Sequence, residues 1–95
     1  MATNGKLATK RPGKRELRAR IEAERAELRR RLQDLLRALA LGPGIAADLE
    51  ALAVEGNEDE AQALLARHAG GTAGDARRMA EAWETAKAIA GLPKV

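Results

Sequence analysis

Basic side chains concentrate in the N-terminal third of this 95-residue chain. Residues 1–37 hold 12 Lys and Arg against five Asp and Glu, a charge of +7, whereas residues 38–95 hold five against nine, a charge of −4. A cationic segment of this kind binds phosphates of a nucleic-acid backbone without reading the bases. We therefore expect a non-catalytic, polyanion-binding protein. The predicted nucleic-acid-binding residues are Lys6, Lys10, Arg11, Lys14, Arg15, Arg18, Arg25 and Arg29.

The same basic segment also fits a plain structural interpretation. If it is helical, Glu16 can pair with Arg20 and Glu27 with Arg31, both four residues apart. Each such pair stabilises an exposed helix by only about 0.3–0.5 kcal/mol. The chain has one Trp and no Phe or Tyr. Base stacking on aromatic rings, and with it sequence-specific binding of single strands, is therefore not expected.

Residues able to carry catalysis or to bind a metal are scarce. The chain has no Cys, no Ser and a single His, which excludes thiol chemistry, a Ser nucleophile and a multi-histidine metal site. His68 is placed to interact with the C-terminal end of a helix dipole. The carboxylates lie on charged helix faces or at helix starts, not in apolar surroundings that would tune them for acid–base work. We predict no enzymatic activity, no cofactor and no metal.

The elements that position these residues are expected to be helices. The apolar residues are mainly Ala and Leu, which favour helix over strand. Apolar spacings of three and four, interrupted by Gly and Pro, predict helices at about 14–41, 44–55, 58–69 and 75–90. Residues 1–13 are expected to form a flexible basic tail. The predicted fold is an all-α bundle of about four helices in one domain, 14–95, with a long basic N-terminal helix.

Local signals predict where these helices begin and end. Gly42 is expected to stop the first helix. Asn57 with Glu60 three residues later is typical of an N-cap with a reciprocal acid. Thr72 or Asp75 is expected to cap the fourth helix. These assignments follow from neighbouring residues alone.

An apolar stripe runs along the predicted first helix. It consists of Leu17, Ile21, Leu28, Leu32, Leu35, Leu36 and Leu39. The stripe thickens toward its C-terminal end, which we expect to contact the core, while the N-terminal half projects. An alternative function follows from it: an assembly protein whose first helix pairs, coiled-coil-like, with itself in a homo-oligomer or with a larger complex such as a virion or other multi-subunit particle. An acidic protein surface is a further candidate partner. The predicted interface residues are Leu17, Ile21, Leu28, Leu32 and Trp83.

Other partners and locations are less well supported. The longest uncharged stretch, 38–47, contains Gly42-Pro43-Gly44 and is too short and broken to span a bilayer. The first helix lacks aromatic anchors, so membrane-surface binding is not expected. The acids that open the third helix would repel phosphate, which argues against DNA reading by that helix. Without an apolar run typical of a signal peptide, the expected location is the cytoplasm, or a particle assembled there.

Overall fold

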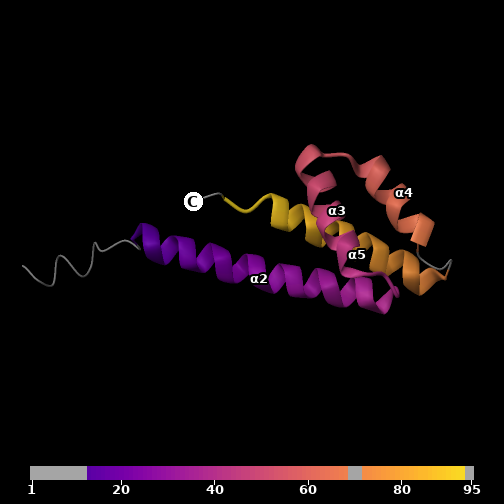
Figure 1. The fold of residues 1–95 in the computed structure, drawn as a ribbon, viewed down its shortest axis with the longest axis horizontal. Coiled ribbons are helices and arrows are strands. Elements are labelled where there is room, and N and C mark those ends of the chain that lie inside the picture. The colour runs from indigo at the N-terminus through magenta and orange to yellow at the C-terminus, as the bar shows by residue number, and fades with distance from the viewer. Residues whose placement is uncertain (1–12, 69–71, 94–95) are drawn as a thin grey trace, which may run out of the picture.

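The computed structural model describes residues 13–68 and 72–93, and this part of the chain is all-α (Figure 1). Its helices are α2 (Lys14–Ala38), α3 (Pro43–Glu55), α4 (Glu58–His68) and α5 (Ala73–Ala90). No strand occurs among these residues. The predicted helical bundle is confirmed. The predicted tail, residues 1–13, lies outside the described residues except for Gly13.

The helices pack as an antiparallel pair covered by a hairpin. α2 and α5 run side by side in opposite directions, α3 packs against both, and α4 packs against α3 and α5 (Figure 1). The N-terminal end of α2 extends beyond the C-terminal end of α5 (Figure 1). Within the described residues, no helix is both long enough and apolar enough to cross a membrane.

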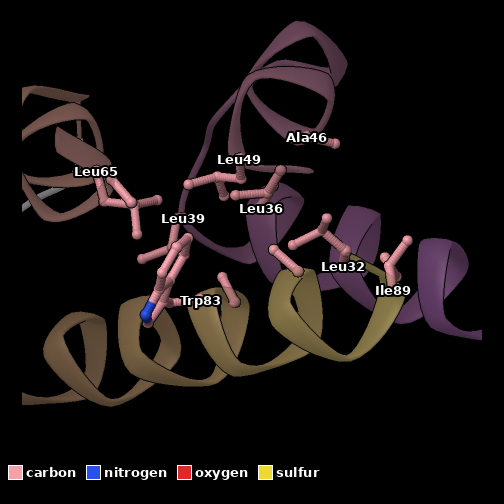
Figure 2. Close-up of a cluster of buried hydrophobic side chains, with 11 residues drawn as sticks. Leu32, Leu36, Leu39, Ala46, Leu49, Leu65, Trp83 and Ile89 are labelled. Atoms are coloured by element: carbon pink, nitrogen blue, oxygen red, sulfur yellow. The ribbon is translucent and has the colours of Figure 1, made fainter. Parts of the chain in front are cut away.

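The core draws buried side chains from α2, α3, α4 and α5, and those of α2 come from its C-terminal half. Its fully buried large side chains are Leu32, Leu36, Leu49 and Leu65. Trp83 points from α5 toward Leu39, Leu49 and Leu65 and supplies the bulk that Phe and Tyr would otherwise provide (Figure 2). Buried alanines on α3, α4 and α5 allow the helix backbones to approach closely. The prediction that the C-terminal end of the leucine stripe contacts the core is therefore confirmed.

The end of α2 corrects one prediction. The helix stops at Ala38, and Ala40, not Gly42, takes the left-handed conformation, with φ of 61°. The Leu41 N–H donates to the Leu36 carbonyl at 2.8 Å and the Ala40 N–H donates to the Arg37 carbonyl at 2.9 Å. This is the Schellman pattern of two bonds that closes a helix. Gly42 was predicted as the stop because glycine favours this conformation, but it instead precedes α3 as its N-cap.

Ala40 and Gly56 form a matched pair for testing this turn. Ala40→Gly is expected to raise the free energy of unfolding by about 0.5–1 kcal/mol, because it removes the left-handed strain of a Cβ at some cost in unfolded-chain entropy. Gly56 ends α3 with φ of 71° and the space around it is open. Gly56→Ala is therefore expected to lower the same quantity by a similar amount. Chemical denaturation of both variants checks this, and equal signs would contradict it.

The predicted N-caps of α4 and α5 are confirmed in part. The Asn57 side-chain oxygen accepts a hydrogen bond from the Glu60 N–H at 3.3 Å, and the Thr72 hydroxyl accepts one from the Asp75 N–H at 3.0 Å. Thr72 is thus the cap of α5, which begins at Ala73, two residues earlier than predicted. The reciprocal bond expected from Glu60 does not form, because the Asn57 N–H donates to the Leu52 carbonyl at 2.9 Å.

Candidate nucleic-acid interface

The first two turns of α2 form an uncovered cationic segment, residues 14–20, which we call the α2 tip. Every residue of the tip is exposed, including Leu17, whose exposed fraction is 42%. The tip carries four basic residues and one acid, Glu16, for a net charge of +3. The basic residues are Lys14, Arg15, Arg18 and Arg20. Three of these four were predicted from the sequence to contact nucleic acid.

The tip is uncovered because α5 is too short to reach it. α5 ends at Ala90, and the chain after it contacts α2 at Arg25, whose guanidinium Nη2 donates a hydrogen bond to the Pro93 carbonyl at 3.5 Å. Ile21 is the first buried residue of α2, with 7% exposed. The tip lies beyond this point and extends past the end of α5 (Figure 1). The face of α2 that is apolar in the bundle therefore continues into the tip without a covering helix.

The electrostatics of the tip favour an anionic ligand. Gly13, the N-cap of α2, makes no side-chain capping bond. The first N–H groups of a helix have no partner within the helix, and the helix dipole adds positive potential there. Lys14 and Arg15 occupy the first two helical positions, where cations oppose the dipole and weaken the helix. Backbone and side chains together make a positive end that a phosphate would neutralise.

The basic groups of the tip are not neutralised by the protein's own acids. Across residues 13–68 and 72–93, no carboxylate lies within 4.0 Å of a tip cation. The pair expected between Glu16 and Arg20 is therefore not formed. Lys6, Lys10 and Arg11, the other predicted contacts near this end, lie outside the described residues.

Further along α2, the arginines bind the chain's own acids. The Arg29 guanidinium donates to both carboxylate oxygens of Glu50 of α3: Nη2 to Oε1 at 2.9 Å, and Nε to Oε2 at 3.0 Å and to Oε1 at 3.3 Å. The hydrogen bond to Glu50 raises the pKa of Arg29 above its ordinary value. Arg29 thus joins α2 to α3, although the sequence placed it among the nucleic-acid contacts.

Two more basic residues in the C-terminal half of α2 form ion pairs with acids of the protein. Arg31 lies 3.5 Å from Glu81 of α5, and Glu27 lies 3.5 Å from Arg30. The expected pairing of Glu27 with Arg31 is therefore wrong. Arg31 pairs with Glu81 on the neighbouring helix α5, and Glu27 pairs with Arg30, three residues away on α2. In the C-terminal half of α2, Arg29 and Arg31 therefore pair with acids of neighbouring helices, whereas Arg30 and Arg37 pair with acids of α2 itself.

Most of the predicted interface residues are buried within the chain. Leu32 is 0% exposed, Trp83 is 3% exposed and Leu28 is half-buried. The Lys87 ammonium lies 5.8 Å from the centre of the Trp83 ring. Leu17 is the member of the set that is clearly exposed. Sequence reasoning missed Val54 of α3, whose exposed fraction is 68%. The sequence does indicate this exposure: α3 is apolar around most of its circumference, so packing in one bundle leaves part of its apolar surface uncovered.

No group of three or more His, Asp or Glu side chains in this part of the chain is arranged to hold a metal ion. An open groove lies between α2 and α5. Its charged rim includes Arg31 and Glu81, which pair with each other.

Comparison with known proteins found no matching family profile, no matching curated protein and no matching solved structure.

Proposed function

We propose that this protein is a non-catalytic helical protein that binds a polyanion, namely a nucleic-acid backbone, through the α2 tip and the basic residues preceding it. The observation that carries the proposal is the exposed cationic end of α2, whose basic groups pair with no acid among residues 13–68 and 72–93. This end belongs to the same continuous helix as the buried part of α2 and extends past the C-terminal end of α5 (Figure 1).

The proposed contacts fall into two groups. Lys14, Arg15 and Arg18 lie on the exposed tip, and Lys6, Lys10 and Arg11 precede it in the sequence. Arg25 and Arg29 contribute less, because each already donates hydrogen bonds within the protein. The single Trp is buried, so contacts to phosphate outweigh stacking on bases.

Binding to duplex DNA as a function of salt tests this proposal. Cations that neutralise phosphates release condensed counterions. If about five to eight phosphates are neutralised, the logarithm of the binding constant should fall with the logarithm of salt concentration at a slope of about −4 to −7. Fluorescence anisotropy with a labelled duplex measures it. Affinity that does not change with salt, or no binding at low salt, would reject the proposal.

Assembly through α2 is the second candidate function, and the exposure of Leu17 favours it. Pairing along the whole stripe is limited, because Ile21 and Leu32 are already buried in the monomer. The surface on α2 that a partner protein can reach is therefore centred on Leu17, with Leu28 half-buried. An apolar contact of this kind persists at high salt, whereas a phosphate complex dissociates.

A further inference from the structure

Two large hydrophobic side chains are exposed in the described part of the chain, and their surroundings have opposite charge. Leu17 lies on the α2 tip, where residues 14–20 carry +3. Val54 lies on α3, and residues 47–60 carry six acids and no Lys or Arg. Each residue exposes apolar area that a partner could cover, and each has the charge that the other would attract.

The surface around Val54 is a continuous face of α3. Ala47, Ala51 and Val54 are spaced by four and three residues and are all exposed, so they lie on one side of the helix. We call these three residues the α3 patch. Asp48 and Glu55 flank the patch and neither forms an ion pair within the described residues.

The α2 tip cannot reach the α3 patch of its own chain. Arg29 fixes the position of α2 against α3 through Glu50, which lies one turn before Val54. Leu17 is 12 residues from Arg29 on the same unbroken helix, which places it about 18 Å away along the axis. Because the helix is continuous, Leu17 cannot fold back onto α3. A second copy of the chain can supply an α3 patch for the α2 tip to contact.

We propose that the α2 tip of one copy docks on the α3 patch of a second copy. Leu17 packs on Ala51 and Val54, and the tip cations face the acids that flank the patch. Because each copy carries one tip and one patch, the contact is heterologous and links copies head to tail. The contact area is small, so the association is weak and strongest at low salt. This contact uses the same tip as the proposed nucleic-acid site, so the two partners compete, but it does not depend on nucleic-acid binding.

Sedimentation velocity at low salt with two single variants tests the head-to-tail contact. Leu17→Glu spoils the tip and leaves the patch intact, whereas Val54→Lys spoils the patch and leaves the tip intact. The wild type should gain average mass with concentration up to about 1 mM, the range of weak dissociation constants. Each variant alone should stay monomeric. Their equimolar mixture should form dimers and nothing larger, because only one intact tip can meet one intact patch. Both positions are exposed, so circular dichroism should show native folding.

Each other outcome overturns the inference. A monomeric wild type over this range would do so, as would a variant that still associates or a mixture that stays monomeric. Association lost in Leu17→Glu but kept in Val54→Lys would show the tip pairing with another tip. This test of self-association is independent of the proposed nucleic-acid binding. The Val54→Lys variant has an intact tip, so the variant should keep its affinity for duplex DNA. Loss of DNA binding with normal association would reject only the nucleic-acid proposal.

Discussion

Replacing Leu36 with alanine is expected to lower the free energy of unfolding by about 2–5 kcal/mol. Leu36 is 1% exposed and belongs to the cluster in which α2 meets the other helices (Figure 2). Its removal costs the transfer free energy of the side chain and leaves a cavity. The core contains no Phe or Tyr whose bulk could shift to fill this space. The total free energy of unfolding of a single domain of this size is only about 5–15 kcal/mol, so the expected loss is a large part of it.

The matched control for this prediction is Leu17→Ala, the same substitution on the same helix. Leu17 is 42% exposed and lies outside the core cluster. Its replacement should change the free energy of unfolding by no more than about 0.5 kcal/mol. Urea denaturation followed by circular dichroism measures both variants. Similar losses in the two would show that the α2 tip is packed against the protein, which would remove the basis of both proposals.

Neutralising the tip is expected to have the largest effect on nucleic-acid binding. The triple variant Lys14→Gln, Arg15→Gln, Arg18→Gln removes three exposed cations and should keep the bundle intact, because none of the three is buried or paired within the described residues. Each lost phosphate contact reduces the salt slope on duplex DNA by about 0.9, so the slope should become shallower by about 2.7. At about 0.1 M salt the affinity should fall roughly 10²–10³-fold. Anisotropy titrations over a range of salt concentrations measure both quantities.

A second triple variant controls for net charge. Arg29→Gln, Arg30→Gln, Arg31→Gln removes the same three charges from α2, but these arginines pair with Glu50, Glu27 and Glu81. It should leave the salt slope nearly unchanged and reduce the affinity by less than about tenfold, through the general field of the protein. If both triples weaken binding equally, the location of the charge on the tip has no role, and only net charge matters.

Features set by a few neighbouring residues could be read from the sequence. The helix class follows from an apolar content of Ala and Leu, and the boundaries of α3 and α4 agree with the predicted ones within a residue. Asn57 and Thr72 were recognisable as caps because a capping side chain bonds to an N–H only three residues away. The cationic character of the N-terminal third is likewise a property of composition alone.

The sequence did not reveal which residue would take the left-handed turn position or which acid would pair with each arginine. Ala40 takes the left-handed position despite its Cβ, because Leu36 and Leu41 must both turn toward the core at the end of α2. Arg29 pairs with Glu50 in two-bond geometry, which is stronger than the single contacts available along one helix. Such pairs join residues that only the packing of α2 against α3 brings together.

The sequence by itself thus determined that the chain is helical, that its first helix is basic and which of its leucines share a face. Only the tertiary structure decided how much of that helix is covered. The buried part of α2 ends at Ile21, because α5 stops at Ala90 and only the short described chain after it continues along α2, where Arg25 contacts Pro93. Charge and periodicity are local properties, whereas exposure depends on the relative lengths and offset of two helices far apart in the chain.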